Sequence, residues 1–220
     1  MQPAAPHLHR LSLWFDPISP YAHLAFEHLP QALEGLSVVV DYKPVLFGAL
    51  LKHHDHKGPA EIEPKRAWTF RQVAWQARSL GVQLDLPAQH PFNPLPVLRL
   101  LLAAAGPSGL PNRHQVACAF HHVWHGGADP LDPTRLAALA QALGVAEGVA
   151  DGDALKSRLK ALGEEALAKG VFGVPTWEWE GHLFWGLDAL PMLRAALQGD
   201  PWFGEGWEQA ARRVPGLQRR

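Results

Sequence analysis

Residues 11–22 place the end of a strand directly before the start of a helix. The mainly apolar run at residues 11–15 predicts a buried strand, and Asp16-Pro17 ends it because proline cannot donate to a strand ladder. Ser19-Pro20 then predicts a helix start, since serine is a favoured N-cap and proline fits the first helical position. A hydroxyl is therefore expected among free N–H groups at the positive end of a helix, which suits an anion or a thiolate. The alternative is that Ser19 serves only as a helix cap.

The remaining secondary-structure signals follow the order strand, helices, hairpin, helix. Residues 36–43 are rich in β-branched and aromatic side chains and predict a second strand, parallel to the first through a right-handed crossover. Two short alternating runs flank Glu180-Gly181 and predict a hairpin, which a helix over 187–197 follows. Periodicity and capping residues predict only helices in between, over 65–80, 95–105, 112–125, 134–143 and 153–169. The predicted fold class is therefore α/β with an all-helical insertion.

The composition limits the partners and the compartment of the chain. Its 220 residues include 20 basic and 21 acidic side chains, and a net charge of −1 gives no electrostatic reason to bind nucleic acid or an anionic membrane. No apolar run of about 18 residues predicts a membrane span, and the polar N-terminus is unlike a signal peptide. Cys118 is the only cysteine, so neither an intrachain disulfide nor a CxxC redox pair can form. A cytoplasmic enzyme, built as one domain or as a domain with a large insertion, fits these limits.

Two groups of histidines raise the question of a metal site. His53, His54 and His56 lie in an expected loop, whereas metal ligands are usually held at fixed helix or strand spacings, so a solvated loop is the preferred interpretation. His121 and His125 stand four residues apart on one helix face, but no glutamate occupies the general-base position between them. We therefore expect no metal at either group.

Three separated motifs carry a family resemblance. Residues 15–27, with Ser19-Pro20, resemble the opening of the DsbA-like thioredoxin superfamily, in the branch where Ser-Pro replaces the redox cysteine pair. That branch contains the 2-hydroxychromene-2-carboxylate isomerases and the kappa-class glutathione transferases. The Pro-Phe-Asn-Pro run at 91–94 resembles the isomerases more closely. Val174-Pro175 before a hairpin resembles the cis-proline loop of thioredoxin-fold proteins, and Trp185-Gly186 with Asp188 completes the third motif.

The resemblance covers about residues 11–200 and implies a thioredoxin-like fold interrupted by a helical domain. The implied thioredoxin-like domain is discontinuous, at 8–52 and 170–200, and the helical insertion domain spans 57–165. Residues 201–220 form a C-terminal extension, whose Trp202, Phe203 and Trp207 are expected to pack back on the body of the protein.

The resemblance also implies a glutathione site. The cysteinyl part of glutathione would pair with the main chain of Val174, beside a cis Pro175, and its sulfur would lie near the catalytic Ser19. His56 stands where the kappa class has an asparagine that contacts glutathione. Asp188 matches an aspartate that the kappa class uses at the γ-glutamyl end.

Two further positions are expected to face the substrate. Trp68 stands where the isomerases have a tyrosine, so it keeps the ring but lacks the hydroxyl, and a core aromatic is the competing interpretation. Asn93 belongs to the Pro-Phe-Asn-Pro run, and it either contacts the ligand or caps the helix that begins with Pro94.

The function that the resemblance implies is a glutathione-dependent isomerase. It would act on 2-hydroxychromene-2-carboxylate or a similar aromatic-derived unsaturated acid, by reversible addition of the thiolate. A kappa-like glutathione transferase or peroxidase on another electrophile is the alternative, and a non-catalytic glutathione or peptide binder is a third. The expected partners are glutathione and a small aromatic-derived substrate, with no nucleic acid and no membrane, and the relatives imply a homodimer.

Overall fold

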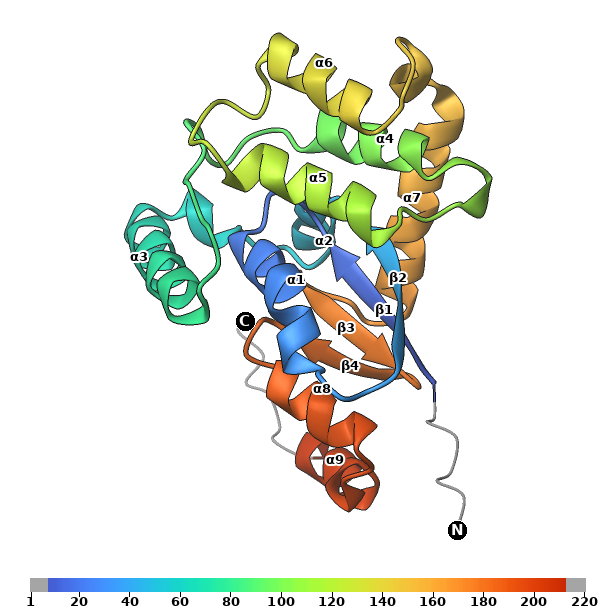
Figure 1. Ribbon diagram of the computed structural model, residues 1–220. Coiled ribbons are helices and arrows are strands. Elements are labelled where there is room, and N and C mark those ends of the chain that lie inside the picture. Colours follow the sequence, from blue (N-terminus) through green and yellow to red (C-terminus); the bar gives the residue numbers. More distant parts are fainter. Residues whose placement is uncertain (1–7, 213–220) are drawn as a thin grey trace.

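Within residues 8–212, four strands form one mixed sheet in the order β2-β1-β3-β4 (Figure 1). The computed structural model describes these residues; residues 1–7 and 213–220, which include the last part of the predicted C-terminal extension, lie outside the described residues. β1 (His9–Phe15) pairs in parallel with β2 (Val38–Pro44), as predicted. β3 (Thr176–Trp179) runs antiparallel to both β1 and β4 (His182–Trp185).

The hairpin between β3 and β4 turns at Glu180-Gly181, as predicted. Both residues have a positive φ, 49° and 83°, which is typical of the two-residue turns whose twist matches that of the flanking strands. β1 begins two residues earlier, and β2 two residues later, than the sequence predicts. The reason is the parallel register, which pairs His9 with Val38.

Helices fill the chain between β2 and β3, and no strand lies between residues 45 and 175 of the described chain. Capping side chains set several helix starts: Asn112 accepts from Gln115 N at 3.0 Å, and Asp132 accepts from Arg135 N at 2.9 Å. The division of the chain into domains remains a prediction. The α-helices are α1 (Pro20–Ala32), α2 (Phe47–His53), α3 (Glu63–Leu80), α4 (Leu95–Ala104), α5 (Arg113–Trp124), α6 (Pro133–Ala142), α7 (Asp153–Ala168), α8 (Leu190–Leu197) and α9 (Glu205–Ala211). Short 3₁₀ helices lie at Pro59–Glu61, Gly106–Ser108, Val149–Asp151 and Pro201–Phe203.

The two faces of the sheet bury two different cores. Along β1, Leu13 and Phe15 join the core that contains α1 and α5, whereas Trp14 joins a second core with α4 and α7. This alternation is the period of two that a strand buried on both faces requires. Figure 1 shows α4, α5 and α6 beyond one end of the sheet and α8 with α9 beyond the other.

The described part of the C-terminal extension packs back on the body, as predicted. Phe203 and Trp207 lie 5.8 Å and 5.5 Å from the ring of Phe184, centroid to centroid. Trp202 stacks edge-on against Phe203 and remains partly exposed. Among the helices of residues 8–212, none combines the length and the apolar character that crossing a membrane requires.

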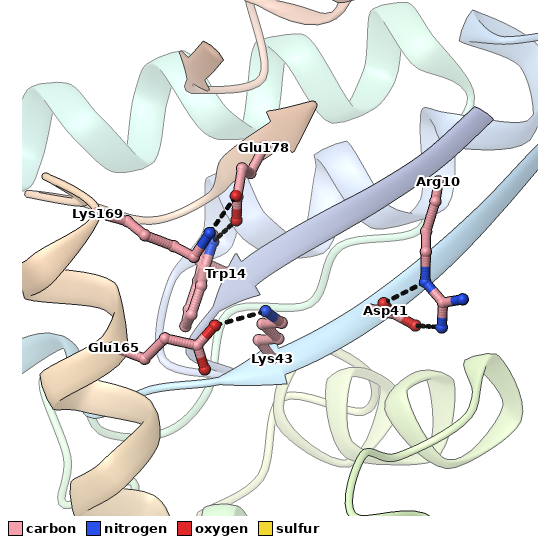
Figure 2. Close-up of polar contacts among 7 residues, drawn as sticks. All are labelled: Arg10, Trp14, Asp41, Lys43, Glu165, Lys169 and Glu178. Atoms are coloured by element: carbon pink, nitrogen blue, oxygen red, sulfur yellow. Dashed lines mark hydrogen bonds and ion pairs between the residues drawn. The ribbon is translucent and has the colours of Figure 1, made fainter. Parts of the chain in front are cut away.

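Charged side chains fasten α7 and the residue after it to the sheet. Lys43 of β2 pairs with Glu165 of α7 at 2.8 Å, and its ammonium lies 4.6 Å from the centre of the Trp14 ring. Figure 2 shows Lys169 and the Trp14 indole meeting at the carboxylate of Glu178 in β3. Trp14 Nε1 donates to that carboxylate at 3.3 Å. The helix is therefore joined to both strands that flank β1.

Candidate active site

Ser19 caps α1 and also touches a segment that lies 155 residues away in the sequence. Its backbone is extended, with φ −86° and ψ 117°, and its Oγ accepts from Ala22 N at 3.2 Å. The same hydroxyl donates to the carbonyl oxygen of Val174 at 3.4 Å. Ser19 is 6% exposed, so this contact forms in a largely dry position. The fold thus brings the predicted N-cap and the predicted proline loop together at the positive end of α1.

The proline loop has the backbone form that the sequence predicts. The Val174–Pro175 peptide bond is cis, which confirms that prediction. Two hydrogen bonds hold the loop on either side of Val174: Thr176 Oγ1 donates to Gly173 O at 2.8 Å, and Gly186 N donates to Pro175 O at 2.9 Å. The position of the Val174 carbonyl opposite Ser19 is therefore fixed by β3 and β4.

The turn before Ser19 is held by side chains of the helical segment. Trp124 Nε1 donates to Pro17 O at 2.8 Å, and His90 Nε2 lies 2.9 Å from Ile18 O. Because a carbonyl only accepts, His90 carries its proton on Nε2, and burial lowers the pKa of His90. Sequence reasoning missed both roles. His90-Pro91 is a second cis peptide bond, which the sequence analysis also did not predict.

Asp16 is a buried acid directly before this turn, and the sequence analysis used it only as the end of a strand. Its side chain is 0% exposed and accepts two backbone hydrogen bonds, from Ile18 N at 3.0 Å and from Phe47 N at 2.9 Å. Burial raises the pKa of Asp16 to about 7, and the two N–H donors oppose that rise. An acidic residue between a buried strand and a helix cap was the available signal.

Asp188 lies on the side of α1 that faces α3 and α8. It is exposed and precedes α8. This helix begins at Leu190 rather than at the predicted residue 187, because residues 186–189 turn away from β4, with Gly186 at φ 102°. Asp188 contributes to a cavity of about 350 Å³ whose wall includes Trp75 and Arg194. Burial, and then the charge of Asp188, raise the pKa of Tyr21, whose hydroxyl donates to Gln72 at 2.7 Å.

The other predicted contacts belong to other segments of the chain: His56 follows α2, Trp68 lies in α3 and Asn93 precedes α4. His56 is exposed, and its backbone N–H donates to Leu51 O at 2.9 Å just after α2. Asn93 Oδ1 accepts from Leu95 N, the first residue of α4, at 3.1 Å, whereas the N-cap position belongs to Pro94 and not, as predicted, to Asn93. Trp68 is 64% exposed, and the core interpretation of its ring is therefore wrong.

The physical reason for the exposure of Trp68 lies in the environment of α3. Only Val73 and Ala77 of this helix are buried, so α3 packs along a single narrow stripe. The core interpretation placed Trp68 on the buried face of α3, and the face that the fold covers is narrower than that.

An aromatic pair flanks the proline loop and was missed as a candidate. The rings of Phe172 and Trp185 are 4.9 Å apart, and the two side chains are 46% and 55% exposed. A Cβ on Gly173 would lie 2.6 Å from Trp185 Nε1, so the indole packs directly on the backbone of that glycine. The pair therefore borders the peptide that leads into Val174.

His121 of α5 forms an ion pair, and its ring stacks on that of His125, which follows the helix. His121 Nε2 lies 2.9 Å from Glu27 Oε1, and the rings of His121 and His125 stack at 4.2 Å. These three residues line a cavity of about 370 Å³ beside α1. Across residues 8–212, no three or more His, Cys, Asp and Glu side chains are grouped so that they could hold a metal ion. The exclusion of a metal stays a prediction.

Comparisons with known proteins agree with this geometry. The DSBA-like thioredoxin domain is matched over residues 10–198. The chain is 26% identical to 2-hydroxychromene-2-carboxylate isomerase of Sphingobium xenophagum, over 85% of this chain and 97% of that protein. It is 25% identical to glutathione S-transferase kappa 1 of Homo sapiens, over 88% and 92%.

The same family is found among solved structures. A structure of 2-hydroxychromene-2-carboxylate isomerase superposes with a TM-score of 0.71 at 21% identity, covering 92% of this chain and 98% of that one. The two named relatives are an isomerase and a glutathione transferase, which supports an enzyme in this family. The predicted resemblance and the predicted thioredoxin-like α/β fold class are confirmed, and the chain belongs to the DSBA-like thioredoxin domain family.

Proposed function

We propose that this chain is a glutathione-dependent isomerase that acts on 2-hydroxychromene-2-carboxylate or a similar aromatic-derived unsaturated acid. The observation that carries the proposal is the contact between the Ser19 hydroxyl, at the N-terminus of α1, and the Val174 carbonyl, 3.4 Å away. The isomerase and the kappa transferase among the relatives support it. Bound glutathione would supply a thiolate that adds to the acid and leaves after a bond has rotated.

The residues around Ser19 fit the thiol end of glutathione. The two hydrogen bonds of Ser19 Oγ are long, 3.2 Å and 3.4 Å, so its proton can turn from the Val174 carbonyl to a sulfur at little cost. The dipole of the 13-residue helix α1 favours a negative charge at the same place. Both effects lower the pKa of a thiol from its ordinary value of about 8.5.

The remaining contacts of glutathione are proposed along the same rim. The main chain at Val174-Pro175 is proposed to pair with the extended cysteinyl part, in the manner of a strand added to a sheet edge. Asp188, an exposed carboxylate, suits the ammonium of the γ-glutamyl end. His56, exposed after α2, has ring nitrogens that can hydrogen-bond the opposite end.

The acid is proposed to lie over exposed side chains beside this rim. Trp68 and Asn93 are the proposed substrate contacts, and both are exposed. The same proposal places the enzyme in the cytoplasm as a homodimer that uses glutathione and a small aromatic-derived substrate. That location is consistent with Cys118 being the only cysteine of the chain.

A kappa-like glutathione transferase or peroxidase is the second candidate. The observation that favours it is the near-equal identity to the isomerase and to the kappa transferase, 26% and 25%. Net consumption of glutathione during turnover separates the two, because an isomerase returns glutathione unchanged whereas a transferase keeps it in the product.

Replacement of Ser19 tests the proposal directly. Ser19→Ala should remove a charge-assisted hydrogen bond, worth about 1.5–3 kcal/mol, and so raise the pKa of the bound thiol by roughly one to two units. Isomerisation of the chromene acid should fall roughly 10- to 100-fold at a fixed glutathione concentration. The thiol pKa is measured by thiolate absorbance against pH, and the rate is measured with and without glutathione.

Asn112→Ala is the matched control, because Asn112 caps α5 in the same way and lies outside the Ser19 turn. It should lower stability by about 1 kcal/mol and leave the thiol pKa unchanged. An unchanged thiol pKa with full activity in Ser19→Ala would reduce Ser19 to a helix cap. Rates that do not depend on glutathione would contradict the proposed cofactor.

A further inference from the structure

One buried carboxylate connects the two loops that frame the proposed glutathione site. Asp16 Oδ1 accepts from Ile18 N, inside the turn that ends at Ser19, and Asp16 Oδ2 accepts from Phe47 N, the first residue of α2. The side chain is fully buried, so the two hydrogen bonds do not compete with water. Each oxygen therefore holds a different segment of the chain.

The contact with Phe47 N supplies a cap that α2 otherwise lacks. The N-cap residue of α2 is Leu46, which offers no side-chain hydrogen bond to the first turn. α2 ends at His53 and leads directly into the loop that carries His56. The start of α2 fixes the direction of that helix, so Asp16 acts on the position of the His56 loop through α2.

The backbone carbonyls of the same turn are already held from the other side. Trp124 Nε1 donates to Pro17 O, and His90 Nε2 donates to Ile18 O. These contacts tie the turn to the helical segment, whereas only Asp16, among the hydrogen bonds found in residues 8–212, ties it to α2 through a side chain. Asp16 is thus placed to couple Ser19 with α2.

We propose that Asp16 is a positioning residue for glutathione: its carboxylate fixes the Ser19 turn against α2 and so sets the spacing between the thiol end of the site and the loop that carries His56. This inference rests on the proposed function, because it takes these two regions as opposite ends of one ligand. Both hydrogen-bonding partners of Asp16 are donors. A protonated carboxyl has only one good acceptor oxygen, so protonation weakens one of the two connections.

Three titratable groups on the neighbouring elements bond to partners other than Asp16. His90 donates to the turn and burial lowers its pKa, and Lys43 at the end of β2 pairs with Glu165. Tyr21 of α1 donates to Gln72. Titration of Asp16 is therefore governed by burial and by its two N–H donors, and burial raises its pKa to about 7.

The first experiment uses the ligand-free protein. In an NMR titration from pH 5.5 to 8.5, the amides of Ile18 and Phe47 should shift with one shared midpoint, near the pKa of Asp16. Asp16→Asn should abolish that transition, because an amide nitrogen replaces one acceptor oxygen at every pH. Separate midpoints for the two amides would overturn the inference, as would a transition that survives in Asp16→Asn and so belongs to another group such as His90.

The second experiment measures binding of S-methylglutathione, which has no thiol to titrate. At pH 8 the affinity of Asp16→Asn should be roughly tenfold weaker than that of the wild type, the loss expected for one hydrogen bond to a charged group. The ratio of the wild-type affinity to the variant's affinity should fall from about ten at pH 8 toward one below pH 7, and taking the ratio removes the effect of groups that titrate in both proteins. Equal affinities with equal pH profiles would overturn the inference.

Asp132→Asn is the matched control for the second experiment. Asp132 accepts one capping hydrogen bond, from Arg135 N, and asparagine can replace a carboxylate that uses one oxygen. The affinity of Asp132→Asn for S-methylglutathione and its pH profile should equal those of the wild type. A loss of affinity as large as that of Asp16→Asn would show that the effect is unspecific and would overturn the inference. A wild-type chain that binds no S-methylglutathione would overturn the proposed function, and the shared amide transition would still decide whether Asp16 couples the two loops.

Discussion

The buried carboxylate of Asp16 should make the fold less stable as the pH rises from about 4 to 7. Its pKa is 3.8 in the unfolded reference and about 7 in the folded protein, because burial disfavours the charged form. The folded state therefore binds more protons than the unfolded state between these two values. The extra free energy of unfolding that this difference in bound protons provides is fully present below pH 3.8, decreases between pH 3.8 and 7, and is absent above about pH 7.

The size of the effect follows from the shift in pKa. About three units, at ~1.4 kcal/mol for each unit, give roughly 4 kcal/mol of unfolding free energy between the two ends of the window. Asp16→Asn keeps one acceptor oxygen, as the protonated carboxyl does, but it cannot ionise, so the unfolding free energy of the variant lacks this pH dependence. The variant should thus become more stable relative to the wild type as the pH increases.

Urea unfolding of both proteins at intervals from pH 4.5 to 8 measures this difference. Subtracting the two curves removes the contribution of every other titrating group, including the histidines. A difference that stays constant with pH would refute the reasoning, because the carboxylate would then be as easily ionised when buried as in water. A difference of opposite slope would show that the two N–H donors outweigh burial.

Two further predictions concern packing and a buried imidazole. Burial lowers the pKa of His23 from 6.5 to about 4. The contribution of His23 to the free energy of unfolding is therefore fully present above pH 6.5 and decreases by about 3 kcal/mol as the pH falls to 4. His23→Gln should remove this pH dependence from acid unfolding curves, and an unchanged dependence would contradict the prediction. Gly173→Ala should displace the Trp185 indole, change its fluorescence and lower the free energy of unfolding by about 1–3 kcal/mol. A Cβ added at Gly163, inside α7, has no heavy atom within 4 Å, so Gly163→Ala should raise the melting temperature. Equal effects of the two alanines would contradict the close contact at Gly173.

Local signals in the sequence were sufficient for much of the fold. The hairpin at Glu180-Gly181 and the start of α1 after Ser19 depend on a few adjacent residues, and each lies where it was predicted; α5 begins at Arg113, one residue after the predicted start. The meeting of Ser19 with Val174 was not a local signal. It was expected only because the motifs resemble a family in which a helix N-terminus faces a proline loop.

The support of the site could not be predicted, because it depends on contacts between distant segments. His90 and Trp124 reach the Ser19 turn across 72 and 107 residues, through single hydrogen bonds that no periodicity encodes. The sequence around Asp16 indicates only the end of a strand, and the second role of this residue depends on Phe47, which lies 31 residues away. The exposure of Trp68 depends on how much of α3 its neighbours cover, and that is a property of the assembled fold.

The lysine–carboxylate pairs of α7 and the residue after it limit how that helix can move against the sheet. Glu165 pairs with Lys43 of β2 and Lys169 pairs with Glu178 of β3, and these two strands lie on opposite sides of β1 (Figure 2). A rotation of α7 about its axis would therefore separate at least one of the two ion pairs. Separation would leave a partly buried charge without its partner, which is costly. The two pairs therefore hold α7 and the sheet in one relative orientation.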